Sequence, residues 1–129
     1  PSAALTIDDI LAEGIDFISF GTNDLTQLTL GLDRNNERIQ KYFNEMHPSV
    51  LKLIKMVIDA CKRAGVTTSI CGQAASNPEM VKILIRYGID SVSANIDSVE
   101  KIRAVVISEE KKLLIESTKH ISELLKSEK

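Results

Sequence analysis

Short apolar runs alternate with segments of helical periodicity along this 129-residue chain. Three runs, at 16–20, 66–70 and 89–94, have the length and the β-branched or aromatic content of buried strands. Between the first two lies a segment whose apolar residues recur every three or four positions, which is typical of a helix that buries one face. Because successive parallel strands are joined by helical crossovers, this alternation predicts an α/β fold with a parallel sheet.

Helices are indicated by end signals as well as by periodicity. Thr6 and Asp9 resemble a capping box, and Pro48 suits the first turn of the longest helix, which Gly65 closes. The stripe expected to be buried on that helix comprises Val50, Leu51, Ile54, Val57, Ile58 and Cys61. The expected helices span 6–14, 48–65, 77–88 and 98–106, with an amphipathic segment at 108–125 and a turn at 33–36. Residues 25–32 are expected to be irregular or only briefly helical.

The first two strands each end in polar or reactive residues. Gly21, Thr22, Asn23 and Asp24 follow the first strand, and Cys71-Gly-Gln73 follows the second. Ligands in α/β folds bind at the carboxyl ends of parallel strands, where loops carry function without disturbing the packed sheet. We therefore expect the Asp24 carboxylate and the Cys71 thiol to face one pocket, and catalysis is the leading hypothesis.

Residues 21–24 also have ordinary structural interpretations. Asp24 suits a helix N-cap as well as a Mg²⁺ ligand, since Mg²⁺ binds through one or two carboxylates plus substrate oxygens. Asn23 either stabilises a turn or, with the backbone N–H groups of 21–23, holds an anionic substrate. Gly21 permits close backbone approach in either case.

The two cysteines differ in their setting. Cys61 belongs to the apolar stripe of a helix and is expected to pack in the core, whereas Cys71 follows a strand and can meet substrate. They are not expected to form a disulfide. Arg34 is either a surface charge paired with Asp33 or a guanidinium fork for phosphate or carboxylate. His47 is expected to cap or pack rather than to catalyse.

Composition limits the classes of function. The formal net charge of −2, with both signs mixed, gives no support for nucleic-acid binding. No apolar run approaches the ~20 residues that a membrane span needs. Two cysteines without zinc-type spacing fit a reducing compartment, so we expect a cytoplasmic protein. The start at Pro1 leads us to expect a longer parent chain.

Several motifs together resemble the phosphoenolpyruvate-utilising enzymes. The segment Gly21-Thr-Asn-Asp-Leu-Thr-Gln27, continued by Leu28-Thr-Leu-Gly-Leu-Asp-Arg34, is similar to the signature of that family. Further matches are His47-Pro-Ser-Val-Leu-Lys-Leu-Ile54, Ile70-Cys-Gly-Gln73 and Gly88-Ile-Asp-Ser-Val-Ser93. The resemblance covers most of the chain.

The resemblance implies a role for each candidate site residue. Family members move a phosphoryl group between a phosphohistidine on a mobile domain and pyruvate bound in a C-terminal barrel. Asp24 resembles the family's Mg²⁺ ligand, and Arg34 resembles an arginine that contacts the phosphoryl group. Cys71 resembles the acid or base that exchanges a proton with the methyl carbon of pyruvate. The residues that resemble the family's substrate-holding turn are Gly21, Thr22 and Asn23.

The residue after Gly72 points to one branch of the family. Cys-Gly-Gln at 71–73 resembles the phosphoenolpyruvate synthases, whereas the dikinases and enzyme I of the sugar phosphotransferase system usually carry Cys-Gly-Glu. The implied activity is ATP-dependent phosphorylation of pyruvate to phosphoenolpyruvate, with enzyme I or pyruvate phosphate dikinase as the alternative.

The implied partners follow from that activity. They are pyruvate or phosphoenolpyruvate, the phosphohistidine and ATP-binding domains of the parent chain, and further copies in a homo-oligomer, with neither nucleic acid nor membrane. A non-catalytic dimerisation module is the alternative from another class. The segment at 108–125 would then join an assembly instead of packing on its own domain.

The implied fold is a TIM (β/α)₈ barrel. Residues 1–129 would form the C-terminal portion of this phosphoenolpyruvate- and pyruvate-binding domain, roughly its last three β/α units, with 107–129 as an extra C-terminal helix. A small flavodoxin-like sheet is the competing architecture, although its glycine-rich phosphate loop is absent after the first strand.

A piece of a barrel is expected to be incomplete in function and in packing. The family's second metal carboxylate lies just upstream of the residues matching Pro1-Ser-Ala3. This piece alone is therefore expected to be inactive and to bind Mg²⁺ weakly if at all. Its open sheet edges and bare helix faces are expected to make it self-associate.

Overall fold

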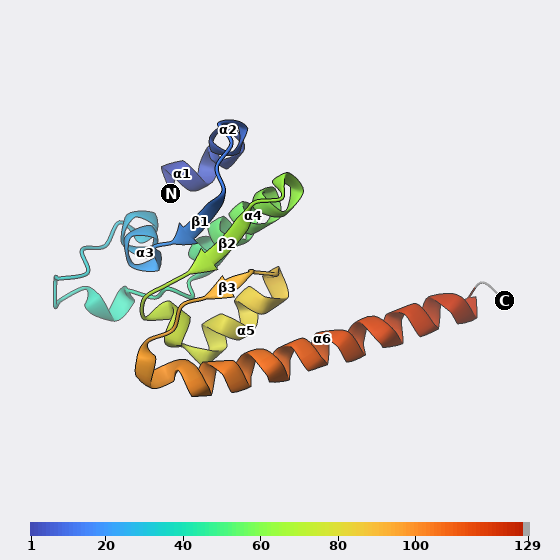
Figure 1. Ribbon diagram of the computed structural model, residues 1–129. Helices are drawn as coiled ribbons and strands as arrows, with labels where there is room; N and C mark the ends of the chain where they lie inside the picture. Colours follow the sequence, from blue (N-terminus) through green and yellow to red (C-terminus); the bar gives the residue numbers. More distant parts are fainter. Residues whose placement is uncertain (128–129) are drawn as a thin grey trace.

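The computed structural model describes residues 1–127 and contains a sheet of three parallel strands (Figure 1). The strands lie side by side in chain order as β1 (Phe17–Phe20), β2 (Thr67–Ile70) and β3 (Ser91–Val92). β1 pairs with β2 along its whole length, and Phe20 lies opposite Ile70 at their carboxyl ends. The predicted α/β class and parallel sheet are confirmed. The third strand is shorter than the expected 89–94, because only two of its residues pair with β2.

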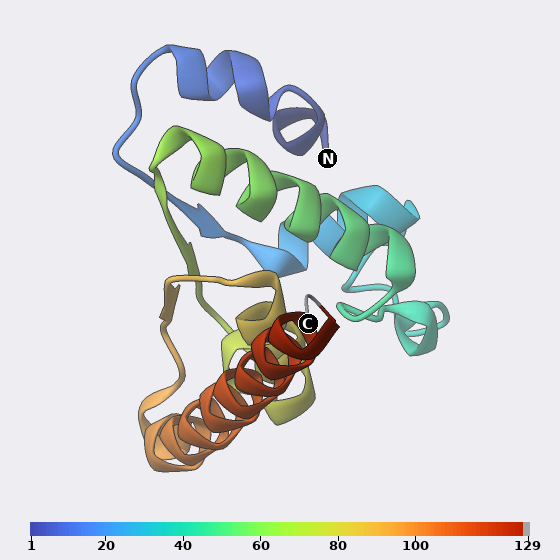
Figure 2. The same ribbon diagram turned by 90° about the vertical axis from the view of Figure 1, so that its right-hand side faces the viewer.

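Helices connect the strands and cover one side of the sheet. The α-helices are α1 (Ser2–Leu5), α2 (Ile7–Ala12), α3 (Thr22–Leu30), α4 (Pro48–Ala64), α5 (Pro78–Tyr87) and α6 (Val99–Ser127). The short 3₁₀ helices are η1 (Gln40–Tyr42), η2 (Ala74–Ser76) and η3 (Ile96–Ser98). The crossover helices α4 and α5 lie on the same face of the sheet (Figures 1 and 2). None of the described helices is both long enough and apolar enough to cross a membrane.

The core lies between the sheet and these crossover helices. Phe20 of β1 and Ile70 of β2 pack in one buried cluster with Ile54 of α4 and its apolar neighbours. The predicted stripe on α4 is confirmed, except that Leu51 is only partly buried. His47 caps this helix as expected, since its ring accepts a hydrogen bond from a backbone N–H of the first turn.

The opposite face of the sheet is largely exposed. Ser19, Ser69 and Ser91 lie in register across the three strands on this face, and Phe17 is 66 % exposed. Within residues 1–127, β1 and β3 each pair with a single strand, so both edges are open. A closed barrel would bury this face and pair both edges. Three strands do not close, and the barrel itself stays a prediction.

Helix α3 follows β1, where residues 25–32 were expected to be irregular or briefly helical; the helical alternative is confirmed, and the helix begins earlier, at Thr22. It begins directly after Gly21 and carries Thr22, Thr26 and Thr29 at helical spacing. The first two are buried, and within residues 1–127 the buried hydroxyls of Thr26 and Thr29 have no hydrogen-bond partner. The sequence did not decide between the two alternatives because the buried positions of this helix hold threonines, which give no apolar signal and favour strands. The predicted turn at 33–36 is confirmed by a backbone hydrogen bond across it.

The capping box expected at Thr6 is wrong. The Thr6 side chain makes no hydrogen bond to the start of α2, and its Oγ1 instead donates to the Ser2 carbonyl at 3.1 Å. The short helix α1, which was not predicted, brings that carbonyl one turn below the hydroxyl. A threonine hydroxyl readily donates a hydrogen bond to the carbonyl four residues earlier in a helix. The Thr6 hydroxyl is therefore engaged by α1 and does not cap α2.

Helix α6 is one continuous helix of 29 residues, although two segments were expected. Arg86 of α5 anchors its first part, because Nε donates to Glu109 at 2.6 Å and the Nη groups reach Glu116 at 3.2 and 3.3 Å. The Glu109 side chain is only 4 % exposed and also forms an ion pair with Lys112. The helix then extends beyond the sheet (Figure 1), so residues 108–125 pack on their own domain only in part. Residues 128 and 129 of the predicted extension lie outside the described residues.

A carboxylate ties β3 to β2 at the amino end of the sheet. Asp90 Oδ2 accepts hydrogen bonds from the backbone N–H and from the hydroxyl of the buried Thr68, both at 2.8 Å. These two bonds, with a smaller contribution from the Lys62 charge, lower the pKa of Asp90. The ionised form is therefore the one that holds the two strands together.

Asp90→Asn is expected to lower the free energy of unfolding by about 1 kcal/mol near pH 7, since solvent screening reduces what a charged hydrogen bond contributes at an exposed site. A carboxyl whose pKa is depressed by folding contributes stability above its unfolded pKa of about 3.9, and that stability is lost as the pH falls through the folded pKa. Urea unfolding from about pH 7 to pH 3 should therefore show a steeper acid loss in the wild type than in the variant. Asp16→Asn, at another exposed carboxylate, is the control, and equal effects of the two substitutions would contradict the assignment.

Candidate functional site

The carboxyl ends of β1 and β2 bring two of the predicted site segments together. Because Phe20 lies opposite Ile70, the next residues along the two strands, Gly21 and Cys71, lie at neighbouring positions. The Cys71 thiol bridges the two ends, since its Sγ donates to the Phe20 carbonyl at 3.7 Å. The in-register pairing thus places the turn after β1 and the thiol after β2 at one edge of the sheet.

Asp24 lies in the first turn of α3 and does not cap it. The N-cap position is held by Gly21, with Asp24 three residues later, so the N-cap interpretation of this aspartate is wrong. A carboxylate in the first turn is favoured by the helix dipole and stays exposed to solvent here. It is therefore available to a ligand approaching the carboxyl end of β1.

Asp24 and Cys71 were expected to face one pocket, but only Asp24 borders the groove found next to it. That groove is mostly apolar, lies between α1, β1 and α3, and is lined by Ala4, Ile18 and Leu28 among others. Cys71 does not line it. The two groups share an edge of the sheet, but the thiol is turned toward the Phe20 carbonyl.

A polar network links the turn after β1 to the segment between α3 and α4. The Thr22 hydroxyl donates to Glu45 Oε1 at 2.7 Å. The Asn23 amide, oriented to satisfy both of its neighbours, donates to the same Glu45 oxygen at 3.3 Å and accepts from Arg34 Nη1 at 3.0 Å. The Arg34 backbone N–H donates to Gln27 Oε1 at 3.1 Å. Three of the predicted substrate-binding residues are therefore joined in one cluster.

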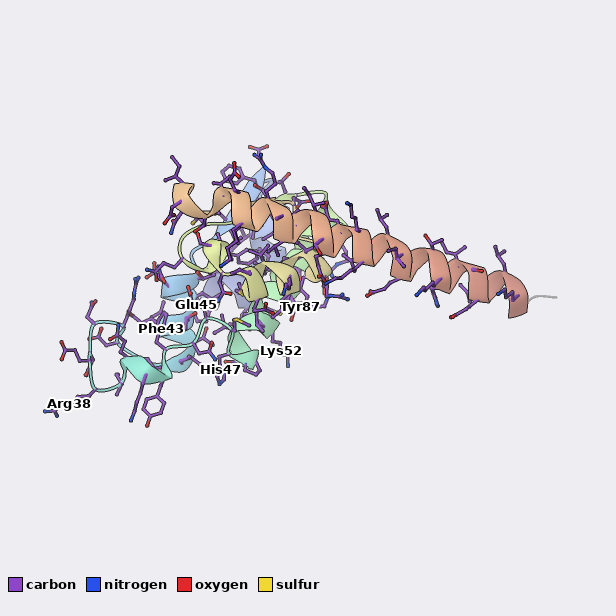
Figure 3. All side chains as sticks on the ribbon, turned by 90° about the horizontal axis from the view of Figure 1, so that it is seen from below. Arg38, Phe43, Glu45, His47, Lys52 and Tyr87 are labelled. Atoms are coloured by element: carbon purple, nitrogen blue, oxygen red, sulfur yellow. The ribbon has the colours of Figure 1, made fainter. Side chains whose placement is uncertain are left out.

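Glu45 is the member of this cluster that the sequence did not indicate. It lies close to α3, whereas Arg38 lies at the far tip of the same loop (Figure 3). It precedes the motif at 47–54 without belonging to it, and its partner Thr22 is 23 residues away. Gln27 was quoted only as part of the Gly21–Gln27 segment, and its contact with the Arg34 backbone was not foreseen.

The two cysteines behave as expected from their places in the chain. Both are free thiols; Cys61 is fully buried on α4 and Cys71 is exposed at the edge of the sheet. Burial, and after it the negative charge of Asp90, raises the pKa of Cys61. Cys61 is therefore held in its neutral form as a core residue.

The described residues do not by themselves form a metal site. Within residues 1–127, no three histidine, cysteine, aspartate or glutamate side chains gather closely enough to hold an ion. Asp24 offers one exposed carboxylate at the start of α3. One carboxylate is compatible with a single protein ligand to Mg²⁺ and does not make a site on its own.

Comparison with known proteins identifies the family. Residues 1–111 match the model of the PEP-utilising enzyme family, PEP-binding domain. The chain belongs to this family. The motifs at 21–34 and 70–73, on which the resemblance was based, both lie within the matched range.

Named relatives support the same conclusion. The chain is 65 % identical over 113 residues to a phosphoenolpyruvate synthase of Pyrococcus furiosus, a match that covers 88 % of this chain and 14 % of the relative. It is 41 % identical over 128 residues to the phosphoenolpyruvate synthase of Aeropyrum pernix, covering 97 % of this chain and 16 % of that protein. A phosphoenolpyruvate-protein phosphotransferase of Haemophilus influenzae is 46 % identical over 106 residues, covering 82 % of this chain and 18 % of that protein. The chain thus spans less than a fifth of the length of each.

The two thiols are expected to differ sharply in reactivity toward Ellman's reagent. Cys71 is exposed and should react at once, whereas Cys61 is buried and should react only when the protein opens or unfolds. The release of thionitrobenzoate should show one fast thiol in the native chain and two in urea. Cys71→Ser should abolish the fast phase. A fast phase that survives in this variant would contradict the placement of the cysteines.

Proposed function

We propose that this chain forms part of the phosphoenolpyruvate and pyruvate site of a phosphoenolpyruvate synthase. In this proposal the whole enzyme uses ATP to phosphorylate pyruvate through a phosphohistidine on another domain. The observation that carries it is the pairing of Phe20 with Ile70, which sets the turn at 21–24 beside Cys71. The names of the synthase relatives and the glutamine at position 73 support this branch of the family.

Cys71 is proposed to handle the proton at the methyl carbon of pyruvate. Its thiol is exposed at the carboxyl end of the sheet, so a substrate can reach it without opening the core. When pyruvate becomes the enolate, the C–H bond breaks, its electron pair forms the carbon–carbon double bond, the π pair of the carbonyl moves to oxygen, and the thiolate form of Cys71 takes the proton. The reverse transfer returns the proton to carbon. A positioned acid or base of this kind typically contributes about 10²–10⁴-fold to the rate.

The turn after β1 and Arg34 are proposed to hold the anionic parts of the substrate. Backbone N–H groups in the first turn of α3, from Thr22 and Asn23, have no acceptor within the helix and favour a negative charge at its start. The contact of Arg34 with Asn23 uses one N–H of a guanidinium that carries five. The rest of the fork suits a phosphoryl group, for which transfer needs mainly positioning and charge neutralisation.

Magnesium is proposed as the cofactor, with Asp24 as one of its ligands. The exposed carboxylate at the start of α3 fits that role, although within residues 1–127 no three histidine, cysteine, aspartate or glutamate side chains gather around an ion site. When bound, the ion would stabilise negative charge on the enolate and phosphoryl oxygens.

A phosphoenolpyruvate-protein phosphotransferase is the second candidate function. The Haemophilus influenzae relative supports it, because a protein of that name is 46 % identical over 106 residues. The two candidates differ in the phosphoryl donor and acceptor rather than in the pyruvate site. ATP-dependent formation of phosphoenolpyruvate by the parent enzyme would distinguish the synthase from the phosphotransferase.

Cys71→Ala in the full-length parent enzyme is expected to lower the rate at which pyruvate methyl protons exchange with solvent by about 10²-fold or more. Proton NMR in deuterated water measures the exchange directly. Cys61→Ala, at the buried cysteine, is the matched control and should retain it. Unchanged exchange in Cys71→Ala would refute the assigned chemistry and would favour the non-catalytic dimerisation module.

The isolated 129-residue chain is expected to form no measurable phosphoenolpyruvate from ATP and pyruvate. The reason is that its described residues gather no complete metal site and that it spans a small share of the length of its relatives. A coupled assay for phosphoenolpyruvate, with the full-length parent enzyme as positive control, tests this. Any ATP-dependent product from the isolated chain would overturn the expectation.

A further inference from the structure

We propose that Glu45 is a positioning residue that aims the Arg34 guanidinium at the substrate through the amide of Asn23. This inference rests on the proposed function, since it assigns a new residue to the same site. Glu45 lies outside the segments that resemble the family's motifs, and it approaches the site from the loop that precedes α4.

Two donors converge on one oxygen of Glu45. The Thr22 hydroxyl at 2.7 Å and the Asn23 amide nitrogen at 3.3 Å both reach Oε1. Thr22 is 2 % exposed, so its hydroxyl needs a protein acceptor, and Glu45 supplies it. The carboxylate is half-buried and is thereby held in one place beside the first turn of α3.

The acceptor fixes which way the Asn23 amide faces. With Nδ2 directed to Glu45, the carbonyl Oδ1 faces Arg34 and accepts from Nη1 at 3.0 Å. The opposite orientation would set the amide N–H₂ against the guanidinium N–H groups, donor against donor, and Oδ1 against the carboxylate. Glu45 therefore determines that the side chain next to Arg34 presents an acceptor.

The hydrogen bonds of Glu45 also hold the loop that carries Arg34 against α3. Within the loop, the backbone N–H groups of Asn35, Arg38 and Met46 bond side chains only two residues away, which shapes the loop locally. Two other bonds connect the loop to helix α3: the Thr22 hydroxyl donates to Glu45, and the Arg34 backbone N–H donates to Gln27. Removing the Glu45 acceptor should free the Asn23 amide to rotate and leave the guanidinium without a fixed partner.

The kinetic test uses the full-length parent enzyme with Glu45→Ala, Glu45→Gln and the control Glu37→Ala, which removes an exposed carboxylate from the same loop. Glu45→Ala should raise the KM for phosphoenolpyruvate about tenfold, the usual effect of losing a hydrogen bond that orders a charged group. Glu45→Gln keeps a carbonyl oxygen for both donors and should restore a KM close to that of the wild type. Glu37→Ala should leave the KM unchanged.

Spectroscopy on the 129-residue chain tests the geometry without any catalysis. In the wild type, the Nη signals of Arg34 should be separate, because the bond to Asn23 slows rotation of the guanidinium; in Glu45→Ala they should merge. If Glu45→Ala does not fold, Glu45→Asp replaces it in both experiments, since it keeps the charge but withdraws the oxygen by one methylene. It is expected to behave as Glu45→Ala.

The outcomes separate the two proposals. An unchanged KM in Glu45→Ala, or a KM in Glu45→Gln as high as in Glu45→Ala, refutes the role of Glu45 while Cys71-dependent proton exchange stands. Loss of the Cys71 dependence refutes the proposed function instead. In that case merged Arg34 signals would still show that Glu45 orders the guanidinium, and unmerged signals would refute the network as well.

Discussion

The parallel, in-register pairing of β1 with β2 is the constraint on which the rest of the site depends. It aligns Phe20 with Ile70, both of which are buried against α4, and so sets Gly21 beside Cys71. A slip of one strand by one residue would turn either Phe20 or Ile70 toward the exposed face and remove its side chain from the core that holds the strands together. Register and burial therefore fix each other: the packing of the core places Cys71 beside Gly21, and the contact of its thiol with the Phe20 carbonyl orients the side chain.

Two kinds of positioning meet at this edge of the sheet. The backbone of β1 and β2 places the turn at 21–24 and Cys71, and it is held by paired strands and by the buried face of α4. Arg34 comes from a loop, where hydrogen bonds to Gln27 and Asn23 take the place of a rigid element. Loops tolerate the polar side chains that ligand binding needs, but they hold them only through such networks. Glu45 gives this loop an anchor on the helix that follows the turn.

The sequence predicted the elements with a strong periodic signal and missed those without one. The long helix α4 has an apolar stripe with a proline at its start and a glycine at its end, and it was predicted nearly residue by residue. Helix α3 was left open between a brief helix and an irregular segment, because threonines occupy its buried positions and a threonine counts as polar in a periodicity pattern although Thr26 is fully buried. The capping box at Thr6 failed because a preceding turn of helix offers the same hydroxyl a nearer acceptor. Local propensity does not decide between two partners that compete for one donor.

By itself, the sequence determined the α/β alternation, the strand ends that carry Asp24 and Cys71, and the family to which these motifs belong. Each of these features depends on a short segment, in which spacing and residue type are enough to predict it. The tertiary structure alone decided that Gly21 and Cys71 lie side by side, that Asp24 borders a groove which the thiol does not line, and that Glu45 joins the cluster. Such contacts join residues far apart in the chain, and they exist only once the strands have paired and the loop has folded back on α3.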